Sequence, residues 1–126
     1  MSGANLSGAN LTKASLIEAN LSRANLTSAN LTEAKLQGAD LNRANLANLK
    51  LQAANLQGAK FGVVSLQSMD LSNVNFADVD LSKADLSKSS LRKACLRGAN
   101  LEKACLQWSN LIMANVSGAN LKKGRC

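Results

Sequence analysis

The sequence contains no histidine, tyrosine or proline, and only one tryptophan and two phenylalanines among 126 residues. Without histidine, the chain lacks the side chain most often used for proton transfer near neutral pH, which is also the commonest zinc ligand. Its Asp, Glu, Lys and Cys residues form no nucleophile–base pair, metal-ligand spacing or phosphate-binding loop. We therefore expect a protein that is not an enzyme and that has no cofactor or metal site.

Long apolar runs are also absent. No run of eighteen apolar residues exists, so the sequence predicts no membrane span, and the N-terminus lacks the basic, apolar and small segments of a secretion signal. These absences predict a cytoplasmic protein. Cysteine is scarce as well, and Cys95, Cys105 and Cys126 are spaced like neither a disulfide framework nor a CxxC site. We expect reduced thiols.

What the chain does have is a repeat of five residues. Leucine occupies twenty-one of the twenty-four positions spaced by five from Leu6 to Leu121. The exceptions are Phe61, Phe76 and Val116. Two residues before each of these large residues stands a small one, most often alanine, from Ala4 to Gly124. A period of five fits neither a helix nor a strand, so it indicates a unit that turns a corner every five residues.

The motif Ala-Asn-Leu-x-x carries a specific resemblance. Segments 24–28 (Ala-Asn-Leu-Thr-Ser) and 99–103 (Ala-Asn-Leu-Glu-Lys) are typical, and the whole chain resembles the pentapeptide-repeat family. The resemblance implies an all-β fold, a right-handed quadrilateral parallel β-helix with four pentapeptides in each coil. Leu and the preceding Ala would point inward. We expect about six coils and a single solenoid domain over residues 1–126.

The physical chemistry of the residues agrees with coils that turn at each pentapeptide. Glycine recurs two residues after the leucine, where a type II turn needs positive φ. It does so at Gly8, Gly38, Gly58, Gly98 and Gly118. The Asn side chains are expected to bond backbone groups within the turns. Residues twenty apart would stack at about 4.8 Å.

One coil departs from the small-residue rule. It has Val64, Met69, Val74 and Val79 at small positions, and Phe61 and Phe76 at large ones. We interpret this coil as a locally wider shaft that larger apolar groups refill, in preference to a ligand cavity.

Charge is distributed unevenly along the chain. Residues 1–82 have no net charge, whereas residues 83–126 carry the whole +7. Stacking places five basic residues on one edge, interrupted by Val63: Arg23, Arg43, Lys83, Lys103 and Lys123. Nucleic-acid phosphates or an anionic surface would relieve the repulsion along this basic edge. The alternative is a solvated edge that discourages aggregation.

Charges of opposite sign also stack. Lys60 would lie between Asp40 and Asp80, and Lys50 beside Asp70. These pairs predict ion pairs between coils that hold the register.

An apolar patch on outward positions near the C-terminus consists of Trp108, Ile112 and Met113. It predicts a contact with a partner or a second copy. Alternatively, Trp108 lies on the wall over Lys88 as a cation–π pair. Neither terminus has a capping helix. An excised fragment, an engineered chain and a homodimer formed through an uncapped end all fit that observation.

Three functions follow from these features. The leading prediction is a non-catalytic scaffold or protein-interaction module with an unknown protein partner. The second is direct nucleic-acid binding through the basic edge. The third comes from the resemblance, since some family members are acidic, dimeric DNA mimics that inhibit type II topoisomerases. The charge of +7 disfavours that third function.

Overall fold

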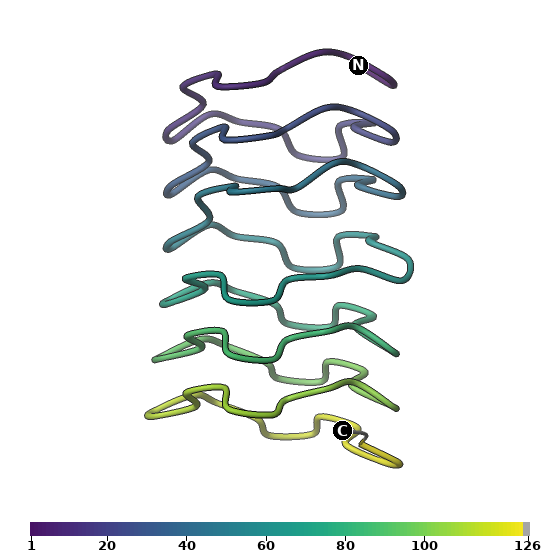
Figure 1. The fold of residues 1–126 in the computed structure, drawn as a ribbon, viewed down its shortest axis with the longest axis vertical. Coiled ribbons are helices and arrows are strands. Elements are labelled where there is room, and N and C mark those ends of the chain that lie inside the picture. Colours follow the sequence, from purple (N-terminus) through teal and green to yellow (C-terminus); the bar gives the residue numbers. More distant parts are fainter. Residues whose placement is uncertain (125–126) are drawn as a thin grey trace.

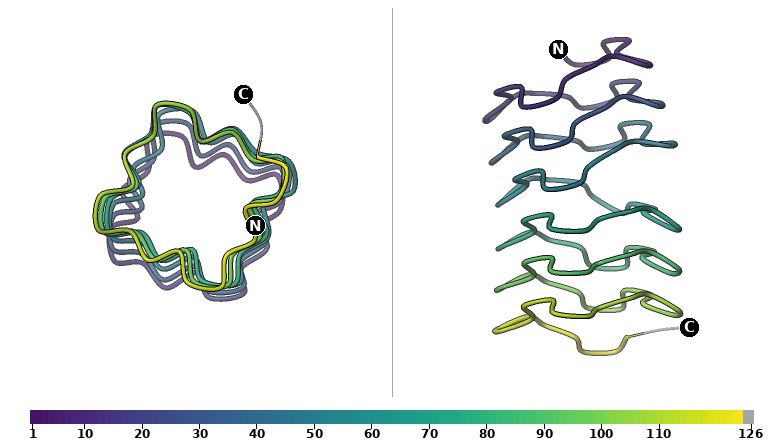
Figure 2. Two further views of the ribbon diagram at one scale, coloured as in Figure 1. Left: turned by 90° about the horizontal axis from the view of Figure 1, so that it is seen from below. Right: turned by 90° about the vertical axis from the view of Figure 1, so that its left-hand side faces the viewer.

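The chain winds into a stack of square coils in the computed structural model, which describes residues 1–124 (Figure 1, Figure 2). These residues form no helix and no extended strand. Single residues pair instead as isolated parallel bridges, from Asn5 with Asn25 to Asn100 with Asn120. Each partner lies 20 residues further along the chain. The expectation of an all-β repeat solenoid is thereby confirmed, and none of residues 1–124 belongs to a helix that could span a bilayer.

A four-residue turn forms each corner of a coil. In the turn 26–29, the Ala29 N–H donates to the Leu26 carbonyl at 3.0 Å. The third residue of the turn has positive φ, between 53° and 68° in the described chain. Glycine is not required there, because Arg23 and Lys83 adopt the same conformation at 57° and 61°. Charged residues therefore also adopt the positive φ that the expected type II turn needs, at some steric cost.

Asn and Asp side chains bond the backbone of these turns, as predicted. The residue before the central leucine accepts, through Oδ1, the N–H two residues further on. Asn30 accepts the Thr32 N–H at 3.0 Å, and Asp85 accepts the Ser87 N–H at 2.9 Å. The Asn or Asp that commonly precedes the leucine therefore stabilises the turn that follows it.

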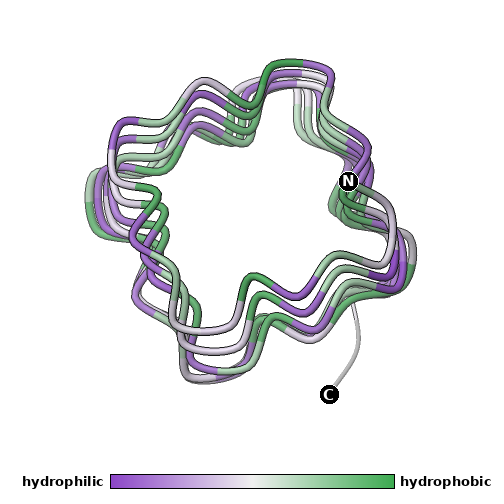
Figure 3. Ribbon diagram, turned by 90° about the horizontal axis from the view of Figure 1, so that it is seen from above, coloured by the Kyte–Doolittle hydropathy of each residue, from purple (hydrophilic) through white to green (hydrophobic). Residues whose placement is uncertain are grey.

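Leucine and alanine fill the interior. Leu26, Leu31 and Ala29 are fully buried, and apolar residues recur at the same place in successive coils (Figure 3). Each buried leucine side chain contributes about 1.5–3 kcal/mol. Backbone bonds hold the coils together, for example Leu26 N–H to the Asn45 carbonyl and Asn45 N–H to the Ala24 carbonyl, both at 2.9 Å.

This ladder is interrupted between residues 41–51 and 61–70, a region that we name the ladder gap. The bridges of residue 40 with 60 and of 55 with 75 form, but those of 45 with 65 and of 50 with 70 do not. Among the described residues, six N–H groups that would bond across this region find no backbone acceptor: Arg43, Leu46, Asn48, Leu51, Ser65 and Asp70. Two adjacent sides of the square are therefore open.

The turn at residues 61–64 explains the first open side. Val63 occupies the third turn position, where a β-branched residue strongly disfavours positive φ. Gly62 takes the positive φ instead, at 65°, and the closing bond from Val64 N–H to the Phe61 carbonyl is not formed. The displaced turn carries its backbone away from the coil above.

Side-chain size explains the second open side. The closing bond of a turn is 3.0 Å at Ala84, 3.1 Å at Leu49 and 3.2 Å at Val74, and it is longest, at 3.4 Å, at Met69. Leu49 also occupies a small position, one coil above Met69. Two large side chains in one column hold the coils apart.

The interpretation of a refilled shaft holds on two sides only. Val74, Phe76 and Val79 are completely buried or nearly so, and the Phe61 and Phe76 ring centroids lie 6.2 Å apart. On the other two sides the larger residues border the ladder gap. There a hollow of about 400 Å³ opens beside Phe61, Val63, Val64 and Met69.

Candidate interaction surface

Four acidic side chains, Asp40, Asp70, Asp80 and Asp85, bond the backbone of the turns. Asp40 Oδ1 accepts the Asn42 N–H at 2.9 Å and the Asn42 Nδ2 at 2.7 Å, and these bonds lower the pKa of the Asp40 carboxyl. Asp70 Oδ1 accepts the Ser72 hydroxyl and N–H, and its Oδ2 accepts Gln52 Nε2 at 3.2 Å. The bond from the Ser72 hydroxyl is the largest cause of the lowered pKa of Asp70. Both groups therefore stay anionic acceptors at neutral pH.

The predicted stacking of Lys60 between Asp40 and Asp80 is confirmed, but Lys60 forms no direct ion pair in the described chain, and the predicted pairing of Lys50 with Asp70 is wrong. The ion pairs within residues 1–124 are Lys13 with Glu33 at 3.5 Å and Lys103 with Glu102 at 3.7 Å. Lys60 is not among them, because both carboxylates beside it accept amide N–H groups, although its charge contributes to the lowered pKa of Asp40. Asp80, for example, accepts the Ser82 N–H at 2.9 Å. Nor do any Cys, Asp and Glu residues in this part of the chain gather into a metal-binding group.

The basic edge lies along one corner of the rod. Its residues, Arg23, Arg43, Lys83, Lys103 and Lys123, all occupy the third turn position with positive φ. Val63 separates the two arginines from the three lysines at the ladder gap. Lys103 is bonded to Glu102, so the uninterrupted part of the edge is partly neutralised.

The apolar patch lies on two neighbouring corners of the last coil. Trp108 is 77% exposed, Ile112 59% and Met113 72%. No cation–π contact joins Trp108 to Lys88 within residues 1–124. The tryptophan therefore projects into solvent, and the patch remains a candidate contact surface.

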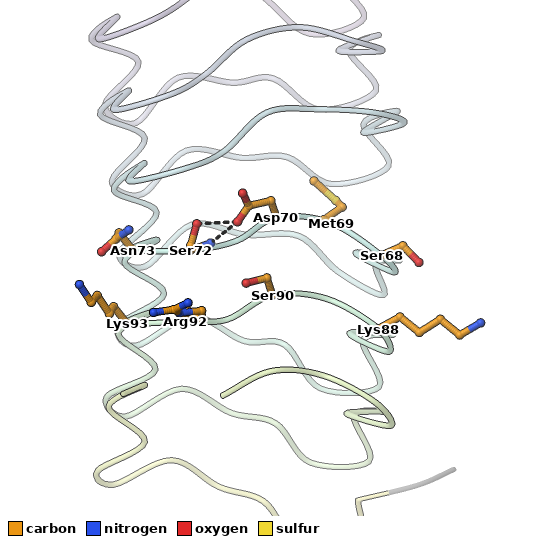
Figure 4. Close-up of a pocket in the computed structure, with 9 residues that line it drawn as sticks. All are labelled: Ser68, Met69, Asp70, Ser72, Asn73, Lys88, Ser90, Arg92 and Lys93. Atoms are coloured by element: carbon orange, nitrogen blue, oxygen red, sulfur yellow. Dashed lines mark hydrogen bonds between the residues drawn. The ribbon is translucent and has the colours of Figure 1, made fainter. Parts of the chain in front are cut away.

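Sequence reasoning missed a concentration of positive charge directly above this patch. A hollow of about 530 Å³ on the wall carries three exposed cations, Lys88, Arg92 and Lys93 (Figure 4). We name it the basic hollow. Lys88 and Lys93 extend from its two corners, and Arg92 lies on the wall between them (Figure 4). Its remaining lining residues are Ser68, Met69, Asp70, Ser72, Asn73 and Ser90.

None of the three cations of the basic hollow has an ion-pair partner among the described residues. Asp70 lines the same hollow, but hydrogen bonds already engage both of its oxygens. The positions of Lys88, Arg92 and Lys93 in the sequence could have predicted this cluster, because these residues lie on neighbouring corners of one coil. A search along columns of residues twenty apart could not detect it.

The cysteines differ from expectation at one position. Cys95 is a half-buried free thiol, whereas Cys105 is buried and disulfide-bonded, so the prediction of reduced thiols is wrong for Cys105. Cys126 lies outside the described residues.

Comparison with known proteins identifies the repeat. A family model described as pentapeptide repeats matches residues 1–27, 24–62 and 70–107 with eight copies. The unmatched interval 63–69 coincides with the atypical turns of the ladder gap. No curated protein matches the chain.

Solved structures have the same architecture. HetL, a pentapeptide-repeat protein involved in heterocyst differentiation regulation in the cyanobacterium Nostoc, is 33% identical with a TM-score of 0.52. The match covers 96% of this chain and 61% of HetL. A trypsin-treated form of QnrB1, a plasmid-mediated fluoroquinolone resistance protein, is 17% identical with a TM-score of 0.70. That match covers 98% of this chain and 65% of QnrB1. The chain thus spans less than two thirds of either protein.

Proposed function

Because the chain belongs to the pentapeptide-repeat family, we propose that it is a non-catalytic interaction module that binds an anionic partner through its positively charged C-terminal coils. A stack of coils presents fixed outward positions on four walls, so binding orders few side chains beyond those that make contact. Such preorganised surfaces lose little entropy on association.

Unpaired positive charge carries this proposal. From residue 83 onward, the described part of the chain contains seven outward cations without an ion pair: Lys83, Lys88, Arg92, Lys93, Arg97, Lys122 and Lys123. Clustered like charges lower stability, and an anionic partner would compensate them. The carboxylates of Asp40, Asp70, Asp80 and Asp85, by contrast, bond the turns internally.

Direct nucleic-acid binding is the second candidate function. It is supported by the stacking of Lys83, Lys103 and Lys123 along the basic edge, where the Lys83 and Lys103 amides bond the next coil at 2.8 and 3.0 Å. A topoisomerase-inhibiting DNA mimic is disfavoured by the charge of +7. Right-handed winding, about six coils, one domain over residues 1–126, a cytoplasmic location and a homodimer formed through one end remain predictions.

Fluorescence anisotropy tests the proposal. Labelled polyglutamate, a neutral polyglutamine and a DNA duplex are titrated with the protein at low and moderate salt. We expect polyglutamate to bind, with an affinity that falls as salt rises, and polyglutamine not to bind. Absence of binding to either polyanion at low salt would contradict the proposed function.

A plasmid gel with and without bacterial gyrase separates the alternatives. Retardation of naked DNA that weakens with salt, without polyglutamate binding, would favour the nucleic-acid function. Loss of supercoiling without retardation would favour the mimic. Neither result is expected of a module whose partner is an acidic protein.

A further inference from the structure

We infer that the basic hollow and the apolar patch together form one docking surface for an extended acidic segment of another protein, a segment that also carries apolar side chains. The inference rests on the proposed function and specifies both the wall and the chemistry of the partner.

The two features occupy adjacent rows of one wall. The Lys88 N–H donates to the Gln107 carbonyl at 2.9 Å, and the Lys93 N–H donates to the Ile112 carbonyl at 3.0 Å. Trp108 and Met113 therefore lie one coil from Lys88 and Lys93, a spacing of about 4.8 Å. One short segment can contact both rows at once.

The upper row, which is the basic hollow, selects an acidic partner. Lys88, Arg92 and Lys93 are exposed, line one hollow and have no ion-pair partner in residues 1–124. Asp70 forms no ion pair with them, since Ser72 and Gln52 bond its two oxygens, and its single negative charge leaves the three cations in excess. Carboxylates of a partner would supply the missing counter-charge, and the planar Arg92 group suits a bidentate contact.

The lower row, which is the apolar patch, selects apolar side chains of the partner. Three coils carry polar residues at the position above Trp108, namely Ser28, Asn48 and Ser68. The fold therefore does not require an apolar group there. Trp and Met are enriched at the centres of protein interfaces, where Trp is a frequent anchor. Their exposed side chains would become buried against the partner.

The shape of the surface favours a polypeptide segment. The wall of the basic hollow is recessed between its two corners, as Figure 4 shows, which suits a narrow chain and not a flat bilayer. Successive side chains of an extended segment point to opposite sides. Acidic side chains could thus reach the upper row while apolar ones reach the lower row. Nucleic-acid phosphates would leave Ile112 and Met113 unused.

The test uses the labelled peptide Glu-Leu-Glu-Phe-Glu-Leu-Glu and a second peptide in which Ser replaces Leu and Phe. Three triple variants are compared with the unchanged chain by anisotropy at about 0.15 M salt. The hollow variant is Lys88→Ser, Arg92→Ser, Lys93→Ser, and the patch variant is Trp108→Ser, Ile112→Ser, Met113→Ser. The matched control is Lys83→Ser, Lys103→Ser, Lys123→Ser, which removes the same charge from the basic edge. Circular dichroism checks that each variant folds.

We expect the hollow variant to weaken binding of the first peptide about tenfold and the control to weaken it less than about threefold. The patch variant should bind the first peptide about tenfold more weakly than the unchanged chain does, but should bind the serine peptide with the same affinity. The serine peptide already lacks the apolar side chains that contact the patch, so loss of the patch removes no further contact. This non-additivity distinguishes a specific site from general charge attraction.

Several outcomes would overturn the inference. Equal losses in the hollow and control variants would leave the proposed function standing but remove this wall as the site. Binding to phosphatidylserine vesicles without peptide binding would assign the surface to a membrane. Self-association that the patch variant abolishes would assign it to a second copy. If neither these peptides nor polyglutamate binds at low salt, the proposed function itself fails.

Discussion

Individual residues control the local geometry of this rod at two positions in each pentapeptide. The residue before the leucine bonds the turn, and the third turn residue must accept positive φ. Val63 is β-branched and stands at a position that elsewhere accommodates Gly, Ser, Asn and Lys. Its turn correspondingly lacks the closing bond that the neighbouring turns 56–59 and 66–69 form.

Replacing this valine should restore the turn. We expect Val63→Asn to stabilise the protein by about 1 kcal/mol, because Asn tolerates the left-handed conformation that Val disfavours. Urea unfolding measures the change. Ser68→Asn is the control, since residue 68 already has φ of 59° and should gain little. A Val63→Asn variant no more stable than the control would contradict this account of the turn.

The turn carboxylates should make stability depend on pH. The pKa values of Asp40 and Asp70 are lowered from the ordinary 3.8 by bonds to their anionic forms. Their contribution is therefore present above pH 3.8 and is lost as pH falls through the lower folded-state pKa. The variant Asp40→Asn, Asp70→Asn keeps both turn bonds without a titrating group.

We expect this double variant to lose less stability than the unchanged chain when urea unfolding is compared at pH 7 and at about pH 3. Asp78→Asn is the control, because Asp78 stands at the third turn position and accepts no turn N–H within the described chain. An identical pH dependence in the double variant and the unchanged chain would exclude the proposed role of these carboxylates.

At the scale of the element, the coil is the repeating unit, and its contacts with neighbouring coils are not uniform. Two causes meet at the ladder gap: a displaced turn at Val63 and a column of large residues at Leu49 and Met69. Each affects a different side of the square. Backbone groups there lack the bonds that protect their counterparts one coil earlier.

Amide hydrogen exchange should reveal the ladder gap. The amides of Leu46 and Leu51 should exchange on the order of 100-fold faster than those of Leu26 and Leu31, which bond the next coil at 2.9 and 2.8 Å. In Val63→Asn, the Leu46 amide should slow more than the Leu51 amide, because Met69 still holds the second side apart. Equal protection of both pairs in the unchanged chain would show that the coils close in solution.

At the scale of the whole molecule, the ladder gap divides the rod into two stacks, residues 1–60 and 61–124. A solenoid's stability is approximately the sum of its repeats and the interfaces between neighbours. The interface between these stacks has fewer backbone bonds than those between other coils. The stacks should therefore unfold with reduced cooperativity, and the positively charged stack carries the only tryptophan.

Two probes can detect this division. Trp108 fluorescence reports the stack 61–124, whereas circular dichroism reports both stacks. We expect urea midpoints that differ by about 0.5 M in the unchanged chain and by less in Val63→Asn. Coincident midpoints in the unchanged chain would mean that the remaining two sides couple the stacks fully.

The sequence by itself determined the repeat, the inward Leu and Ala columns, the corner at each pentapeptide and the turn bonds of the Asn side chains. These features depend on neighbours within about five residues, so a local pattern contains them. Tertiary structure alone decided the rest, because it depends on which side chains meet between coils. Asp80 bonds a turn amide in preference to Lys60, Leu49 above Met69 opens the ladder, and Lys88, Arg92 and Lys93 line one hollow.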